Sequence, residues 1–224
     1  MKVTIIQHVP FETPGLISRW IAKRGFTSEI IKLFANQPLP KPAGIEFLIV
    51  LGGPMSVNDS DQWIKEERQL INKVVTSNKP MLGICLGAQQ LAVSFGAKVS
   101  SSPVEVGWAP VASTLTAKQL FNAPMSNDVL HWHGEGFNLP VQSVSLFTSN
   151  NWQNQGFQFL RAIGLQFHLE TTDQSLPPLV NADTAFIKKS IFDTSPEIIL
   201  SHQIERQNEE LLDNILDYLV RITD

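Results

Sequence analysis

The sequence has 224 residues, 43% hydrophobic and 17% charged, with a formal net charge of −4. This composition is typical of a globular protein with one large core, and the slight acidic excess argues against a nucleic-acid partner, which would need a basic face. A single cysteine excludes an internal disulfide and favours a reducing compartment, and no stretch is apolar for long enough to span a membrane, so we expect a cytoplasmic protein without a membrane partner.

The first half of the chain alternates short apolar runs with helix-like stretches. Residues 3–6, 47–51 and 80–85 are apolar at nearly every position, which predicts strands buried on both faces, as in a parallel sheet. Residues 16–24, 63–77 and 86–95 have the spacing of helices. Strands alternating with helices predict βαβ units and an α/β fold, a three-layer sandwich around a central, mostly parallel sheet.

The second half has a different pattern. Residues 104–115, 129–132, 143–149, 155–160 and 162–168 predict closely spaced strands and therefore a small antiparallel or mixed sheet. Residues 202–220 predict a C-terminal helix from the spacing of their apolar positions, whereas residues 171–201 give no clear pattern. We predict one domain over residues 1–224, with a core of about 1–170 and a helical extension of about 171–224.

The lone cysteine lies in a Gly-x-Cys-x-Gly segment, Gly83 to Gly87, between a predicted strand and a predicted helix. This pattern indicates a nucleophile elbow, a sharp turn that strains the backbone of Cys85 and leaves room only for glycine on either side. The turn directs the thiol toward the positive end of the helix, which favours the thiolate, and leaves the N–H of Leu86 free to stabilise an oxyanion. The alternative interpretation is a buried thiol of the core.

A cysteine nucleophile needs a base, and His168 is the leading candidate among the five histidines. It precedes Glu170 by two residues, and positions i and i+2 of a strand share a face, so the carboxylate could orient the ring. The alternative is an exposed pair at a strand end. His131 and His133 also share a face, but without a second cysteine or an acidic ligand at a suitable offset we expect a pocket wall and no metal. We expect His8 and His202 to be structural or surface residues.

Several segments taken together resemble the class I, or triad, glutamine amidotransferase family. Within that family, the sequence resembles the subgroup close to the glutaminase domain of GMP synthetase. They follow the family's order and cover roughly Val3 to Glu170. The segments are Gly52-Gly53-Pro54-Met55-Ser56-Val57, Gly83-Ile84-Cys85-Leu86-Gly87-Ala88-Gln89-Gln90-Leu91, Glu105-Val106-Gly107-Trp108, His131-Trp132-His133-Gly134-Glu135 and Gly164-Leu165-Gln166-Phe167-His168-Leu169-Glu170.

The resemblance implies a flavodoxin-like amidotransferase fold and a role for each matching position. Cys85 would attack the carboxamide of glutamine, release ammonia and form a γ-glutamyl thioester, with His168 as acid and base and Glu170 orienting it. The backbone N–H groups of Gly53 and Leu86 would form the oxyanion hole. The residues that would hold the amino-acid head of the substrate are Met55, Gln89, His133, Gly134 and Glu135.

The sequence departs from the family pattern at a few positions. Leu169 replaces a proline and Ala88 replaces a histidine. Glu135 stands where aspartate is usual, and its extra methylene could reshape the pocket for the substrate's head, so the sequence does not decide the identity of the acyl donor. GMP synthetase-like chains continue into an ATP-pyrophosphatase domain, whereas this sequence has no Gly-rich phosphate loop, and we expect no nucleotide chemistry and no cofactor.

Three functions remain open at this point. The first is a glutaminase subunit that passes ammonia to a separate synthase, its partner. The second is a γ-glutamyl hydrolase or peptidase, because the acyl-enzyme would be the same and only the leaving group would differ. The third is a catalytically silent interaction module on the same fold.

Overall fold

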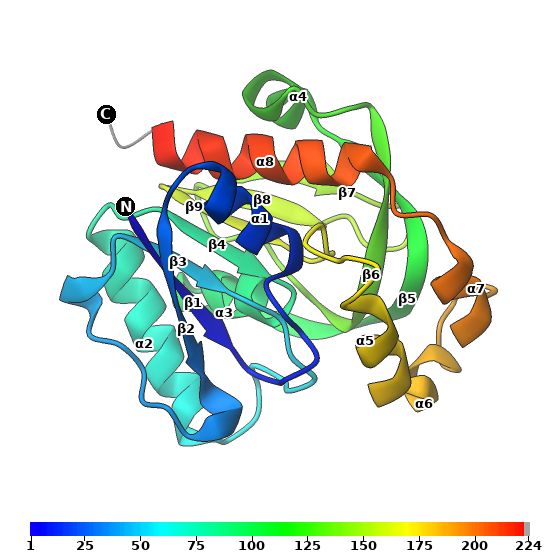
Figure 1. Ribbon diagram of the computed structural model, residues 1–224, viewed down its shortest axis with the longest axis horizontal. Coiled ribbons are helices and arrows are strands. Elements are labelled where there is room, and N and C mark those ends of the chain that lie inside the picture. The colour runs from blue at the N-terminus through cyan, green and yellow to red at the C-terminus, as the bar shows by residue number, and fades with distance from the viewer. Residues whose placement is uncertain (222–224) are drawn as a thin grey trace.

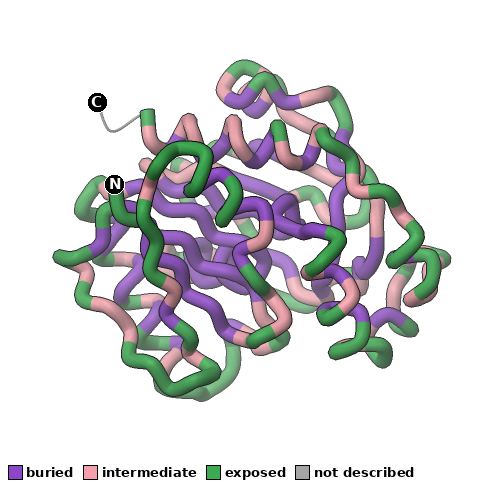
Figure 2. The backbone as a smooth tube through the Cα atoms, viewed as in Figure 1, coloured by how far each residue is buried: buried purple, intermediate pink, exposed green. Residues whose placement is uncertain are grey.

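The computed structural model describes residues 1–221 and contains, within them, a nine-stranded sheet with helices on both faces (Figure 1). The strand order is β2-β1-β3-β4-β9-β8-β7-β5-β6. The sheet forms the buried centre of the molecule, and exposed backbone is concentrated in the surrounding loops and helices (Figure 2). This arrangement confirms the predicted three-layer α/β architecture.

One half of the sheet is parallel and consists of β2, β1, β3, β4 and β9. The strands are β1 (Lys2–Gln7), β2 (Thr27–Lys32), β3 (Phe47–Val50), β4 (Met81–Ile84) and β9 (Ala162–Leu165). Every residue of β3, β4 and β9 is buried, which explains their unbroken apolar runs. The sequence did not predict β2, because this edge strand is mostly exposed and begins Thr-Ser-Glu.

The sequence suggested a small separate sheet for the antiparallel strands. They instead continue the parallel half of the one sheet through β9. They are β5 (Val99–Ser113), β6 (Ser126–Phe137), β7 (Val144–Thr148) and β8 (Gly156–Phe159). The β8–β9 pairing joins the two halves, with Phe157 opposite Gly164. Local patterns predict strands but do not say which strands pair, and here the pairing places β6 near the end of β9.

Helices cover the two faces of the sheet with separate apolar clusters. On one face, α1 (Gly15–Lys23) and α8 (Arg206–Arg221) pack against residues such as Ile5 and Ile49. On the other, α2 (Gln62–Thr76) and α3 (Leu86–Ser94) pack against residues such as Ile6 and Val50. Neighbouring strand residues thus face opposite layers, as the period of two requires.

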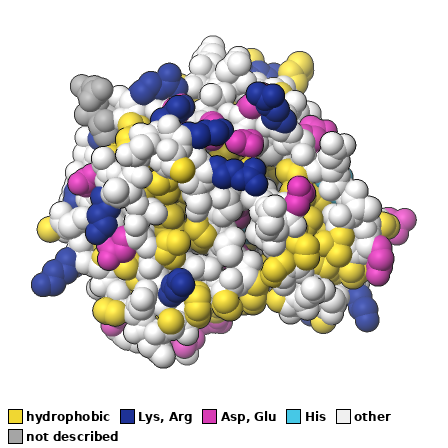
Figure 3. Space-filling view, viewed as in Figure 1, with side chains coloured by type: hydrophobic (Ala, Val, Ile, Leu, Met, Phe, Trp, Pro, Cys, Tyr) yellow, Lys and Arg dark blue, Asp and Glu magenta, His cyan; other side chains and the backbone are white. Residues whose placement is uncertain are grey.

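Ion pairs connect α1 to α8 at the surface. Lys23 pairs with Glu209 and Asp213, and Arg24 pairs with Asp217. In Figure 3, basic and acidic side chains accordingly lie side by side over these two helices. Exposed pairs of this kind contribute little to stability, so the buried contacts of α8 with the sheet hold the helix in place.

The remaining helices lie around the antiparallel half. They are α4 (Leu115–Phe121), α5 (Leu176–Ala182), α6 (Thr184–Ile187) and α7 (Pro196–Ser201). The 3₁₀ turns Leu33–Ala35 and Pro42–Gly44 lie instead in the connection between β2 and β3 of the parallel half. The segment that gave no sequence pattern therefore forms three short helices, and its apolar residues pack on Val106, Leu130 and Trp132 of the sheet. Every helix within residues 1–221 is too short or too polar to cross a membrane.

Candidate active site

Cys85 occupies a strained turn between β4 and α3. Its backbone has φ 49° and ψ −107°, a conformation that residues other than glycine rarely adopt. A Cβ atom on Gly83 would lie 2.5 Å from the carbonyl oxygen of Gly87, and one on Gly87 would lie 2.1 Å from that of Val50. Both glycines are therefore required by close backbone contacts, which confirms the predicted elbow.

The thiol of Cys85 lies at the wall of a cavity of about 390 Å³. Its sulfur is 3.7 Å from the carbonyl oxygen of Trp132 and 3.6 Å from the amide nitrogen of Gln166. Burial raises the pKa of the Cys85 thiol, while the neighbouring His168 and the N–H of Leu86 lower it. The thiol therefore lies where a neighbouring imidazole favours its ionised form.

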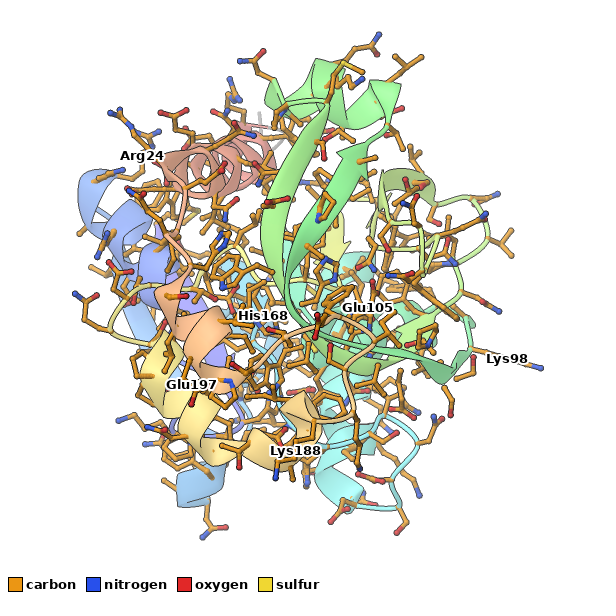
Figure 4. The ribbon with its side chains drawn as sticks, turned by 90° about the vertical axis from the view of Figure 1, so that its right-hand side faces the viewer. Arg24, Lys98, Glu105, His168, Lys188 and Glu197 are labelled. Atoms are coloured by element: carbon orange, nitrogen blue, oxygen red, sulfur yellow. The ribbon has the colours of Figure 1, made fainter. Side chains whose placement is uncertain are left out.

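His168 and Glu170 come together as the sequence predicted, although they lie beyond the strand. β9 ends at Leu165, and the chain stays extended because the N–H of His168 donates to the carbonyl of Leu130 on β6 at 2.9 Å. Nδ1 of His168 lies 2.7 Å from Oε1 of Glu170, and both side chains are buried. Figure 4 shows His168 in the interior of the molecule.

The protonation of His168 is governed by its neighbours. Burial lowers the pKa of the imidazole, but Glu170 and the Cys85 sulfur raise it more, so that it stands well above its usual value of 6.5. Nε2 of His168 is buried and has no partner within hydrogen-bonding geometry in residues 1–221. The ring is thus held by its Nδ1 side, and the nearby Cys85 sulfur contributes to its raised pKa.

The backbone of Glu170 is fixed by the start of α1. Its carbonyl oxygen accepts a hydrogen bond of 2.9 Å from the N–H of Leu16. Gly15 has φ 45°, and a Cβ there would lie 2.0 Å from the same carbonyl oxygen. Only glycine permits this approach, so Gly15 helps to place the carboxylate.

The two residues expected to form the oxyanion hole, Gly53 and Leu86, are neighbours in the structure. Gly53 lines the cavity, and a Cβ on it would lie 3.1 Å from a methyl group of Leu86. The N–H of Leu86 points to the Cys85 sulfur closely enough to lower the thiol's pKa. The two segments meet because β3 and β4 are neighbours in the parallel half of the sheet.

The residues expected to hold the head of the substrate line the same cavity. They are Met55, Gln89, His133, Gly134 and Glu135. The side-chain amide of Gln89 donates to the carbonyl oxygen of Glu135 at 3.1 Å and to Oε1 of Gln166 at 3.3 Å. These hydrogen bonds therefore connect strand β6 to α3, the helix that begins directly after Cys85.

Our reason for expecting no metal at His131 and His133 was partly wrong, because the fold supplies an acidic neighbour. Glu105, opposite His133 on β5, has Oε2 3.1 Å from Nε2 of His133 and 3.9 Å from Nδ1 of His131. Burial raises the pKa of the Glu105 carboxyl, but the two histidines and Asn151 together lower it by more, so that the pKa lies below its usual value. Asn151 and Gln155 also donate to this carboxylate, so protein groups already stabilise its charge. The absence of a metal stays a prediction.

Sequence reasoning missed the other side of the cavity. Glu12, in the loop between β1 and α1, has a buried Oε2 without a hydrogen-bond partner in the described chain. This oxygen would lie 2.1 Å from a Cβ on Gly52, and Cε1 of His168 would lie 3.2 Å from the same Cβ. Burial raises the pKa of the Glu12 carboxyl to about 7. No motif surrounds Glu12, so only the fold could reveal it.

The segment without a sequence pattern also reaches this side of the cavity. Leu179, Asp183, Phe186 and Lys189, from α5, α6 and the adjoining turn, line it together with Phe11. The mouth of the cavity thus combines apolar, acidic and basic side chains. None of them could be assigned from the sequence, because residues 171–201 show no recognisable pattern.

Comparisons with known proteins agree with this geometry. The family model for glutamine amidotransferase class-I matches residues 15–182. The chain is 32% identical over 195 residues to the glutamine amidotransferase-like protein YfeJ of Salmonella typhimurium, covering 80% of each chain. It is 29% identical to the glutamine-hydrolysing GMP synthase of Chlorobaculum tepidum, matching 85% of this chain but only 38% of that protein. The crystal structure of a glutamine amidotransferase from Thermotoga maritima superposes with a TM-score of 0.89 at 30% identity, covering 98% of both chains.

Proposed function

The chain belongs to the class I glutamine amidotransferase family, and we propose that it hydrolyses the γ-carboxamide of glutamine through a thioester on Cys85. The observation that carries this proposal is the strained Cys85 elbow at the cavity wall beside a His168 ring that is hydrogen-bonded to Glu170. A nucleophile, a base and an orienting acid in this order form the arrangement that acyl transfer requires.

The proposed reaction has two halves. In the first, the thiol of Cys85 passes its proton to Nε2 of His168, and the sulfur forms a bond to the carboxamide carbon. The oxyanion accepts hydrogen bonds from the N–H groups of Gly53 and Leu86. The imidazolium then protonates the amide nitrogen, the C–N bond breaks and ammonia departs. A γ-glutamyl thioester remains on Cys85.

The second half returns the enzyme to its starting state. His168 takes a proton from a water molecule, whose oxygen forms a bond to the thioester carbon. The C–S bond breaks, the thiol regains the proton, and free glutamate leaves. Glu170 stabilises the imidazolium in both halves, which the high pKa of His168 supports.

The proposed destination of the ammonia is a separate acceptor enzyme. Support comes from the GMP synthases, named as glutamine-hydrolysing, of which this chain matches about two fifths. A direct test measures ammonia and glutamate released from glutamine by the purified chain. Cys85→Ala should abolish release while its far-ultraviolet circular dichroism stays unchanged, and equal release by both proteins would contradict the proposal.

A further experiment distinguishes the enzyme from a silent interaction module. A diazoketone analogue of glutamine should attach covalently to Cys85 in a ratio of one to one, because the elbow and the base activate the sulfur toward this electrophile. Mass spectrometry of tryptic peptides locates the adduct. An intact, folded chain that is inert toward this probe and toward γ-glutamyl amides would identify a silent module.

A second candidate function is the hydrolysis of γ-glutamyl amides larger than glutamine. The observation that favours it is the acidic part of the cavity, where Glu12 lies near both His168 and Asp183. His168 protonates the leaving nitrogen in the proposed reaction, so groups next to it face the leaving amine. The buried Glu12 oxygen and nearby Asp183 favour a positively charged leaving group.

Two matched substrates test this candidate by charge. The γ-glutamyl amides of 1,4-diaminobutane and 4-aminobutanoate have similar length but end in an ammonium and a carboxylate. The diamine amide should be preferred in kcat/KM by about tenfold, which corresponds to about 1.4 kcal/mol. Glu12→Gln should narrow this preference, and the exposed Glu66→Gln should not. Turnover of glutamine alone would support the first candidate.

A further inference from the structure

We propose that His8, held by Glu67, fixes the Gly52–Gly53 peptide so that the N–H of Gly53 points into the cavity and the oxyanion hole is formed in the free chain. This inference deepens the proposed function and rests on it. It makes His8 a positioning residue, acting through a backbone peptide without touching the substrate.

The contacts of His8 are short and completely buried. His8 directly follows β1, and its Nδ1 lies 2.8 Å from the carbonyl oxygen of Gly52. Its Nε2 lies 2.8 Å from Oε1 of Glu67 on α2, and neither side chain is exposed. The second carboxylate oxygen of Glu67 accepts from the amide of Gln90 on α3 at 3.0 Å. The ring is therefore held between the sheet and the helices that flank the nucleophile.

The direction of the Gly53 N–H follows from peptide geometry. In a trans peptide, the carbonyl of one residue and the N–H of the next point in opposite directions. Because the carbonyl of Gly52 points to His8, the N–H of Gly53 points away from it. Gly53 lines the cavity that contains Cys85, and this is the space into which we place the donor.

The Gly-Gly pair needs such a partner. Glycine adopts both signs of φ with little penalty, so an unsupported Gly52–Gly53 peptide could turn over and remove its N–H from the site. Glycine is nevertheless required, because a Cβ on Gly52 would meet Oε2 of Glu12 at 2.1 Å. Orientation therefore has to come from outside the pair, and the hydrogen bond from His8 supplies it.

The protonation state of His8 follows from its partners. A carbonyl oxygen and a carboxylate both accept hydrogen bonds, so both ring nitrogens must carry protons and His8 is an imidazolium. Burial lowers the pKa of His8, but Glu67, the Gly52 carbonyl and the charge of Glu12 raise it above 6.5 overall. The other charged group near this pair is Arg68 of α2, which donates to Gln90 and Val57.

The consequence for regulation is that the chain needs no partner to form its oxyanion hole. A docking enzyme could receive ammonia from it but would not have to turn the Gly52–Gly53 peptide. We therefore expect the isolated chain to turn over its substrate with the same kcat that it shows in the presence of an acceptor.

Two amide variants separate the two nitrogens of the ring. The amide of His8→Asn reaches about as far as Nδ1 and keeps a donor for Gly52, whereas that of His8→Gln reaches about as far as Nε2 and keeps only the contact with Glu67. Loss of one oxyanion donor reduces kcat by about 10²–10³-fold. We expect that loss in His8→Gln with KM unchanged, and less than about tenfold loss in His8→Asn.

The pH profile adds a readout that a merely structural role would not move. In the natural chain, kcat should fall as the pH rises through the pKa of His8, because loss of the Nδ1 proton releases the Gly52 carbonyl. The Asn variant has no ring to titrate, so this part of the fall should disappear. Thermal unfolding of each variant establishes that it is folded. His202→Gln and Glu66→Gln, which replace residues outside the proposed site, are the control substitutions and should leave kcat unchanged.

The outcomes distinguish this inference from the proposed function. Absence of turnover in the natural chain, for every γ-glutamyl amide, would remove the proposed function itself. Turnover in the natural chain with an equal kcat in His8→Gln would overturn only the role of His8. Equal losses in the Asn and Gln variants would also overturn it, because the variant that keeps a donor for Gly52 would then be impaired as much as the variant that lacks one. Iodoacetamide should alkylate Cys85 at similar rates in all variants, since this reaction forms no oxyanion.

Discussion

Nδ1 of His168 lies 2.7 Å from Oε1 of Glu170, and the backbone of each residue is held by a different element. The backbone of His168 is bonded to Leu130 of β6, and that of Glu170 to Leu16 of α1. The pair is therefore positioned by two elements that are far from it in the sequence. This rigid support is what allows a two-residue spacing to function as a base and its orienter.

Replacement of Glu170 by glutamine should separate orientation from charge. The amide can still occupy the position of the carboxylate, but it no longer stabilises the imidazolium, and the pKa of His168 should fall. In a comparable acyl-transfer triad this loss reduces kcat by about 10⁴-fold. We expect a decrease of about 10²–10⁴-fold in kcat, measured by glutamate release at saturating substrate. A change of less than about threefold would contradict the role of Glu170.

The strained backbone of Cys85 predicts an unusual order of stability. Alanine keeps the Cβ at φ 49° and ψ −107°, whereas glycine relieves the strain. Such strain costs about 1–3 kcal/mol, which exceeds the entropic cost of about 1 kcal/mol for introducing glycine. Cys85→Gly should therefore unfold at a higher urea concentration than Cys85→Ala, although both are inactive. The reverse order would show that the turn carries no strain.

Gly87 should not tolerate a larger residue. A Cβ there would lie 2.1 Å from the carbonyl oxygen of Val50, a backbone atom of β3 that cannot move without disturbing the sheet. We expect Gly87→Ala to lower the free energy of unfolding by about 1–3 kcal/mol. Gly44→Ala is the matched control, because nothing lies within 4 Å of a Cβ at that position, and its unfolding should be unchanged.

Glu12 should make the stability of the protein depend on pH. Burial raises the pKa of this carboxyl from 4.5 to about 7 in the folded chain, so the folded state binds its proton more tightly than the unfolded state does. The contribution is fully present below pH 4.5 and is lost as the pH rises toward 7. Glu12→Gln mimics the protonated form at every pH.

The melting temperature of Glu12→Gln should therefore match that of the natural chain at low pH and exceed it at pH 8. Thermal scans at pH 4.5 and pH 8 measure this difference. A difference of the same size at both pH values would mean that the ionisation of Glu12 is not the cause.

The local sequence was enough to predict the parts of the site that depend on local sterics. The glycines around Cys85 and the spacing of His168 and Glu170 follow from the geometry of one turn and one extended segment. The buried strands β3 and β4 were predicted for the same reason, since strands covered on both faces must be apolar throughout. The exposed, polar edge strand β2 lacked that signal.

The tertiary structure alone decided which residues surround that machinery. His8 meets Gly52 across 44 positions of the chain and Glu67 across 59, and Glu105 meets His133 only because β5 and β6 pair. Such contacts depend on which strands become neighbours, and a pattern read within one segment contains no information about another. The proposed nucleophile could therefore be predicted from the sequence, whereas the groups that we propose to orient its oxyanion hole and to border its leaving group appeared only in the fold.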